Sequence, residues 1–292
     1  MAASIGVDAR QSRFQSTPEL THHIDVGGVR RTYLLHVPDT LRQNAAAPLV
    51  LVFHGGGSHA AAMRRFTRFD TLADSQGFIV AYPEGIKSHW NDTRGLSPAD
   101  DVAFVRILIA QLKRSLHVDE KRIYATGVSN GGFFSVRVAC DLTREVAAVA
   151  AVAAIMPETL MPACKPSAPI SIMFMHGTQD PLVKIEGGMI ARRNSRSVSL
   201  TEAVDFWRRV NHVSDVPART ELPDREGDGT HVRRDVYRGS VDEIEVVVYT
   251  IQGGGHTWPG AVQYLPVSLV GRTSANLDAT GAIWAFFERH HR

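Results

Sequence analysis

The stretch Gly127-Val128-Ser129-Asn130-Gly131 lies between two segments that predict different secondary structures. Residues 122–126 predict a strand, and residues 133–140 predict the helix that follows it. In a nucleophile elbow the serine sits at a sharp, strained turn that exposes its Oγ. Side chains two positions to either side would collide there, so glycine is needed at both. Ser129 is therefore the candidate nucleophile, and the alternative interpretation is an ordinary glycine-rich turn.

Strands and helices alternate along most of the chain, which predicts an α/β fold with a mostly parallel central sheet and helices on both faces. A Gly27-Gly28 turn predicts an opening β-hairpin over residues 22–37. Further strands are expected at 49–53, 78–82, 147–154, 169–175 and 244–251, and further helices at 60–75, 100–116, 201–211 and 276–289. No repeat or linker divides the chain. We interpret residues 1–20 as a flexible N-terminal extension and 21–292 as a single catalytic domain.

Composition excludes some classes of function. The 292 residues carry a formal net charge of only +2, which is too small to indicate nucleic acid or an anionic membrane as the main partner. No apolar run is long enough to span a bilayer. The first residues do not read as a signal peptide, so the compartment stays open between the cytoplasm and export after signal removal. The two cysteines, Cys140 and Cys164, are not spaced as a metal site and could be free or bridged.

A serine nucleophile needs a base to take its proton, and in this chain order the acid comes before the base. His256 lies in Gly253-Gly254-Gly255-His256-Thr257-Trp258-Pro259, directly after the predicted strand 244–251. Asp180 lies in His176-Gly177-Thr178-Gln179-Asp180-Pro181, directly after the predicted strand 169–175. We predict that His256 is the base and Asp180 the orienting acid. The alternatives are a surface histidine and a turn-capping aspartate.

Two further sets of residues complete the expected site. His54-Gly55-Gly56-Gly57 follows a predicted strand, where a loop can donate backbone N–H groups to the oxyanion, and the N–H of Asn130 is the expected second donor. Trp258 and Trp90 are candidates for walls of the substrate site, and the alternative for either is a core residue. His54 is a third candidate for substrate binding. Trp207 and Trp284 are assigned to the core.

Taken together, four motifs resemble the polyhydroxybutyrate depolymerase and feruloyl or acetylxylan esterase group: Leu51-Val-Phe-His-Gly-Gly-Gly, Arg122-Ile-Tyr-Ala-Thr-Gly-Val-Ser-Asn-Gly-Gly, Met175-His-Gly-Thr-Gln-Asp-Pro and Gly255-His-Thr-Trp-Pro-Gly. The resemblance implies an α/β-hydrolase fold, a catalytic triad of Ser129, Asp180 and His256, and oxyanion donors at Gly56 and Asn130. It also implies a cysteine pair at positions like those of Cys140 and Cys164, which is often bridged.

The expected activity is that of a serine carboxylic ester hydrolase that forms an acyl-enzyme and needs no metal or organic cofactor. The expected substrates are small-molecule or oligomeric esters: short-chain, 3-hydroxyalkanoate or hydroxycinnamate. The basic segment Arg192-Arg193-Asn194-Ser195-Arg196 could be a solvated loop or could favour a substrate with a free carboxylate. The alternatives are a serine peptidase or acyltransferase on the same scaffold, or a non-catalytic binding protein with this fold. The oligomeric state stays open.

Overall fold

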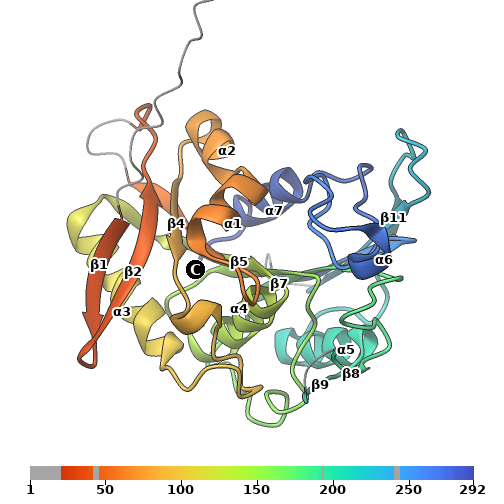
Figure 1. Ribbon diagram of the computed structural model, residues 1–292, viewed down its shortest axis with the longest axis horizontal. Helices are drawn as coiled ribbons and strands as arrows, with labels where there is room; N and C mark the ends of the chain where they lie inside the picture. The colour runs from red at the N-terminus through yellow and green to blue at the C-terminus, as the bar shows by residue number, and fades with distance from the viewer. Residues whose placement is uncertain (1–20, 42–45, 192–193, 240–243) are drawn as a thin grey trace, which may run out of the picture.

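The computed structural model describes residues 21–41, 46–191, 194–239 and 244–292. Its centre is a ten-stranded sheet with the strand order β1-β2-β4-β3-β5-β6-β7-β12-β11-β10 (Figure 1). The strands are β1 Thr21–Val26, β2 Val29–His36, β3 Ala47–Phe53, β4 Ile79–Pro83, β5 Val118–Val128, β6 Ala148–Val152, β7 Ser171–Gly177, β10 Ala218–Glu221, β11 His231–Arg238 and β12 Glu245–Gln252. A separate two-stranded sheet pairs β8 Gly188–Met189 with β9 Arg196–Ser197.

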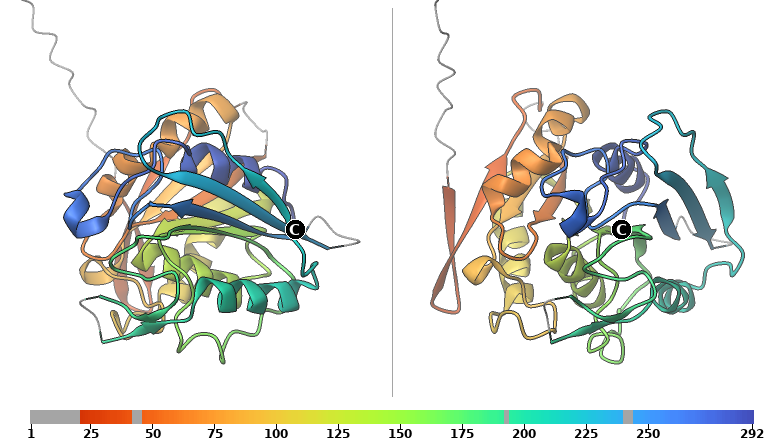
Figure 2. Two further views of the ribbon diagram at one scale, coloured as in Figure 1. Left: turned by 90° about the vertical axis from the view of Figure 1, so that its right-hand side faces the viewer. Right: turned by 45° about the vertical axis from the view of Figure 1, so that its right-hand side comes forward.

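The middle of the large sheet is parallel and its two edges are antiparallel. Strands β4, β3, β5, β6, β7 and β12 all run in the same direction. The predicted N-terminal hairpin forms one edge, and β11 with β10 forms the other. Figure 2 shows these two edges on opposite sides of the molecule. The expected α/β-hydrolase architecture is confirmed.

Helices cover both faces of this sheet. They are α1 Ala60–Thr67, α2 Phe69–Gln76, α3 Asp101–Ser115, α4 Asn130–Asp141, α5 Leu200–Asn211, α6 Val267–Val270 and α7 Ala279–Phe287, with a 3-10 turn, η1, at Ile86–Ser88. Helices α3, α4 and α5 pack on one face, and α1, α2 and α7 pack on the other (Figure 1). Strand β3 is buried along its whole length, and its side chains alternate between the two cores. Apolar residues on both faces are what a central parallel strand requires.

Several local features differ from the expectations. The single helix expected over 60–75 is two helices, because Arg68 adopts a left-handed conformation with φ of 56°. Helix α3 begins at Asp101, one residue after the expected start, because Asp100 is its N-cap and its side chain accepts the N–H of Ala103. Strand β10 was not predicted, because all four of its side chains are exposed and it lacks an alternating apolar pattern. Strand β11 was not predicted either.

Cys140 at the end of α4 and Cys164 form a disulfide, which decides between the two alternatives that the sequence left open. The N-terminal extension at 1–20 and the arginines at 192–193 lie outside the described residues. The interpretation of 21–292 as one domain stays a prediction. Within the described ranges, no helix is long and apolar enough to cross a bilayer, and no group of three metal-binding side chains occurs.

Candidate active site

The fold brings the chemically important segments to one edge of the sheet. The loop at 54–57 follows β3, Ser129 follows β5, Asp180 follows β7, and His256 follows β12. All four strands belong to the parallel block, so their carboxyl ends lie at the same edge. Open α/β sheets bind ligands outside the carboxyl ends of their strands.

Ser129 occupies a strained turn between β5 and α4. Its backbone has φ of 55° and ψ of −120°, a conformation that costs free energy and that folded proteins keep mainly at functional sites. A Cβ at Gly127 would lie 2.6 Å from the carbonyl oxygen of Gly131, and a Cβ at Gly131 would overlap the carbonyl oxygen of Phe53. A Cβ at Gly132 would lie 2.7 Å from the Cβ of Ala154. The turn therefore needs these glycines, as the sequence indicated.

Asp180 and His256 form a buried pair beside this turn. Nδ1 of His256 lies 2.7 Å from Oδ2 of Asp180. The other carboxylate oxygen, Oδ1, accepts the backbone N–H groups of Leu182 and Val183, both at 2.8 Å. Both carboxylate oxygens thus have fixed partners, and His256 lines the same cavity as Ser129.

The glycine loop lies directly against the nucleophile elbow. A Cβ at Gly55 would lie 3.7 Å from the Cβ of Ser129, and a Cβ at Gly56 would lie 3.4 Å from the Cβ of Asn130. Gly57 donates its N–H to Ser88 (2.9 Å), and Ser58 donates its N–H to Gly55 (3.1 Å). The N–H of Gly56 has no such acceptor among the described residues, and Gly56 lines the cavity. Its position fits an oxyanion donor.

His54 stands behind the glycine loop and not in the cavity, which differs from the expected role in substrate binding. Its side chain is fully buried. Nε2 accepts the N–H of Gly85 (3.0 Å), and Nδ1 lies 2.8 Å from the carbonyl oxygen of Gly55. Burial lowers the pKa of His54 to about 4, so the ring is neutral at pH 7, with Nδ1 as donor and Nε2 as acceptor.

The two tryptophans expected as cavity walls are core residues. Trp90 is fully buried and stacks on Phe134 of α4, with ring centroids 5.1 Å apart. Trp258 is 1% exposed, and its indole N–H donates to Thr280 (3.0 Å). Neither lines the cavity that holds Ser129. Both indole N–H groups find acceptors inside the protein, and neither ring forms a wall of this cavity. Trp207 and Trp284 are buried, as expected.

The cavity has other walls, which the sequence did not reveal. It measures about 420 Å³, and its lining residues are Gly55, Gly56, Ser58, Ala62, Met63, Phe66, Val128, Ser129, Leu182, His256, Tyr264, Leu265, Leu269 and Val270. Phe66 of α1 and Tyr264 meet edge to face with their centroids 5.6 Å apart. Five exposed apolar residues occur between 262 and 269, and that apolar run just after the His256 motif was the available signal.

Tyr264 also contacts the machinery itself. Its hydroxyl donates to the backbone carbonyl of His256 at 3.0 Å. Burial, with a smaller contribution from the charge of Asp180, raises the pKa of Tyr264 to about 12. The hydroxyl therefore stays a donor across the physiological range.

A sequence model of the esterase PHB depolymerase family matches residues 31–201, more than half of the chain. The chain belongs to this family. The matched segment includes Ser129 and Asp180 and ends before His256. The place of His256 in the site therefore rests on the 2.7 Å contact with Asp180.

Curated relatives of this chain also indicate an esterase. It is 31% identical over 270 residues to a putative esterase, NocK, from Nocardia uniformis subsp. tsuyamanensis, covering 87% of this chain and 78% of the relative. It is 27% identical over 264 residues to a probable feruloyl esterase C from Aspergillus niger, covering 88% and 83%. It is 28% identical to feruloyl esterase B from Piromyces equi, covering 77% of this chain and 42% of that protein. The protein is a serine carboxylic ester hydrolase.

Solved structures show the same fold. A thermostable esterase superposes with a TM-score of 0.60 at 18% identity, covering 94% of this chain and 63% of that one. An acetyl xylan esterase from Aspergillus awamori superposes with a TM-score of 0.57 at 14% identity, covering 78% and 89%. At these identities the likeness establishes the fold alone.

Proposed function

We propose that Ser129, His256 and Asp180 act as a catalytic triad that cleaves esters of an uncharged, planar aromatic acyl group. Oγ of Ser129 attacks the ester carbonyl carbon while Nε2 of His256 takes the hydroxyl proton. Asp180 accepts the Nδ1–H of His256, which fixes the tautomer with Nε2 free to accept. The contact between His256 and Asp180, beside Ser129 in one cavity, carries this proposal.

The negative charge that develops on the carbonyl oxygen needs donors that are already in place. The N–H groups of Gly56 and Asn130 are proposed for this role, since the two residues lie side by side next to Ser129. Asn130 is the first residue of α4, so the positive end of the helix dipole adds to its effect. Each such donor is typically worth about a hundred- to a thousandfold in rate.

The second half of the reaction uses the same groups in reverse. When the tetrahedral intermediate collapses, the bond to the alcohol breaks and His256 returns its proton to the leaving oxygen. This leaves the acyl group bound to Ser129. His256 then takes a proton from water as the water oxygen attacks the acyl carbon. The bond between that carbon and Oγ of Ser129 breaks, His256 returns the proton to Oγ, and the acid is released.

The lining of the cavity favours an uncharged acyl group. Among the described residues, no Asp, Glu, Lys or Arg side chain lines the cavity, whereas Met63, Leu182, Leu265 and Leu269 do. The edge-to-face pair of Phe66 and Tyr264 supplies an aromatic wall for a flat ring. Hydroxycinnamate esters have such an acyl group, and the relatives named feruloyl esterase agree with this choice.

The test is a panel of esters measured with wild type, Ser129→Ala and Ser58→Ala. The panel contains methyl ferulate, p-nitrophenyl butyrate, 3-hydroxybutyrate oligomers and acetylated xylan. Ser129→Ala should lower kcat by about 10⁴- to 10⁶-fold while the protein stays folded. Ser58→Ala is the matched control, because Ser58 lines the same cavity and should cost less than about tenfold.

Two results would contradict the proposal. Retention of more than about a tenth of wild-type kcat by Ser129→Ala would exclude it as the nucleophile. A higher kcat/KM on acetylated xylan or hydroxybutyrate oligomers than on methyl ferulate would exclude the aromatic acyl assignment and leave the esterase in place.

A further inference from the structure

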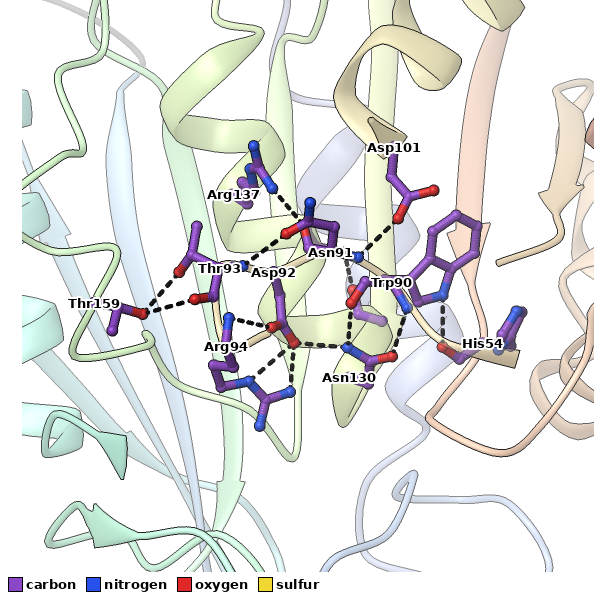
Figure 3. A network of polar contacts seen from close by, with 12 residues as sticks. His54, Trp90, Asn91, Asp92, Thr93, Arg94, Asp101, Asn130, Arg137 and Thr159 are labelled. Atoms are coloured by element: carbon purple, nitrogen blue, oxygen red, sulfur yellow. Dashed lines mark hydrogen bonds and ion pairs between the residues drawn. The ribbon is translucent and has the colours of Figure 1, made fainter. Parts of the chain in front are cut away.

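We propose that Trp90 is a positioning residue that holds the two halves of the oxyanion hole at a fixed separation. This inference rests on the proposed function and goes beyond it, since Trp90 lies outside the substrate cavity. Its side chain is bonded to the glycine loop, and its backbone is bonded to the side chain of Asn130 (Figure 3). One residue therefore connects the two segments that carry the proposed donors.

The first connection fixes the glycine loop. The indole N–H of Trp90 donates to the carbonyl oxygen of His54 at 3.0 Å. That carbonyl belongs to the peptide bond that leads into Gly55, and it lies against Gly131, where a Cβ would overlap it. Two additional bonds tie the same loop to the segment before Trp90: Gly85 N–H to His54 Nε2 and Gly57 N–H to Ser88 O.

The second connection fixes the nucleophile elbow. The side-chain oxygen of Asn130 accepts the backbone N–H of Trp90 (2.8 Å), and its amide nitrogen donates to the carbonyl of Trp90 (3.1 Å). The same amide nitrogen donates to the carboxylate of Asp92 at 2.6 Å. Asn130 is 3% exposed, so water competes little for these bonds.

The segment that carries Trp90 is itself held firmly. The indole is fully buried and packs against Phe53 of β3 and Phe134 of α4. The Arg94 guanidinium pairs with Asp92 and lies 3.9 Å from the ring centroid of Phe133. Lys87, Ser88 and Thr93 all have positive φ, a strain that persists only where the surroundings over-determine the backbone.

These contacts give Trp90 a function that burial alone does not require. An oxyanion donor works only when its N–H already points at the place where the charge develops. If the bond from the indole to His54 is lost, the glycine loop can move relative to the elbow. The separation of the Gly56 and Asn130 amides then changes, while the apolar side chains that line the cavity, such as Phe66 and Tyr264, take no part in these hydrogen bonds and keep their places.

The test compares Trp90→Phe with Trp207→Phe and Trp284→Phe. Phenylalanine keeps an aromatic ring on Phe134 and removes the indole N–H that donates to the carbonyl oxygen of His54. The indole nitrogens of Trp207 and Trp284 are buried without a hydrogen-bond partner among the described residues, so these variants lose no such bond and serve as matched controls. The measurements are kcat and KM on the preferred ester, the inhibition constant of phenylboronic acid, and Tm.

The expected result is specific to the transition state. Trp90→Phe should lower kcat by about ten- to a hundredfold, because a donor is displaced and not deleted, with KM changed less than about threefold. The inhibition constant of the boronate should rise in proportion, because its tetrahedral adduct with Ser129 places an oxygen in the same hole. The two controls should stay within about threefold of wild type in kcat.

Other outcomes would overturn the inference. If Trp90→Phe matches the controls in kcat, or loses activity with an unchanged boronate constant, Trp90 is only a core residue. If Trp90→Phe does not fold, Asn130→Ala decides, because it breaks the second connection and keeps its own backbone N–H. Near wild-type kcat in that variant also rejects the inference. In both cases a strong loss in Ser129→Ala shows that the proposed function survives.

Discussion

Nδ1 of His256 lies 2.7 Å from Oδ2 of Asp180, although 76 residues separate the two in the chain. Oδ1 of the same carboxylate is occupied by the N–H groups of Leu182 and Val183. The carboxylate therefore cannot rotate without losing two hydrogen bonds. This fixed orientation lets us predict what an amide would do in its place.

Asp180→Asn should lower kcat by about 10⁴-fold with little change in stability. The two backbone donors will hold the amide oxygen at the Oδ1 position, which leaves the NH₂ group facing His256. That group donates to Nδ1 and forces the proton onto Nε2, so the imidazole can no longer accept the serine proton. Steady-state kinetics together with a denaturation curve check this. A kcat within tenfold of wild type would show that Asp180 does not orient the base.

His54 predicts a loss of stability in mild acid. Its pKa is about 4 in the folded protein and 6.5 in a model peptide, so between these pH values the unfolded state binds more protons. The contribution of the neutral His54 side chain to the free energy of unfolding is fully present above pH 6.5 and is lost as the pH falls toward 4. The full loss is about 3 kcal/mol.

Chemical denaturation of wild type and His54→Gln at a series of pH values measures this contribution. The difference between the two proteins isolates His54 from other groups, such as His176, whose pKa is also lowered by burial. The free energy of unfolding should fall more steeply in wild type than in His54→Gln between pH 6.5 and 4. Parallel curves would contradict the neutral, buried state of His54.

Tyr264 predicts a change in substrate selectivity. Tyr264→Ala removes the ring that meets Phe66 and should raise KM for an aromatic ester by about tenfold. A tenfold change corresponds to a loss of roughly 1.4 kcal/mol in binding free energy. Tyr264→Phe keeps the ring, removes only the bond to the carbonyl of His256, and serves as the control with little change in KM. Equal effects of Tyr264→Ala on methyl ferulate and p-nitrophenyl acetate would show that the ring does not contact the acyl group.

Replacing Arg94 should lower the stability of the protein strongly. Its side chain is 3% exposed and pairs with Asp92, which is fully buried, so Arg94→Ala leaves a carboxylate without its counter-charge. The expected loss in the free energy of unfolding is about 3–5 kcal/mol. Arg196→Ala is the control, because Arg196 and Glu158 are both about half exposed and such pairs contribute about 0–1 kcal/mol. Equal losses in the two variants would show that the buried ion pair stabilises the protein no more than the exposed pair does.

The sequence could predict the elements whose residues carry a local reason for their structure. Strand β3 is apolar on both faces, and Gly127 is required by steric overlap with Gly131 inside the turn. Gly131 is required by the neighbouring carbonyl of Phe53 on β3. Strand β10 could not be predicted, since its side chains are exposed and pairing with β11 is what orders it. The break at Arg68 is likewise invisible locally, because arginine does not favour a left-handed backbone.

The sequence by itself determined the α/β fold, the order of Ser129, Asp180 and His256, and the glycine loop, because each follows from steric and chemical demands within a few residues. The tertiary structure decided which side chains line the cavity that holds Ser129. Tryptophan can serve as a wall or as a buried donor, and its neighbours settle the choice. Trp90 finds His54 and Asn130 inside the protein, while Phe66 and Tyr264, 198 positions apart by residue number, meet at the cavity.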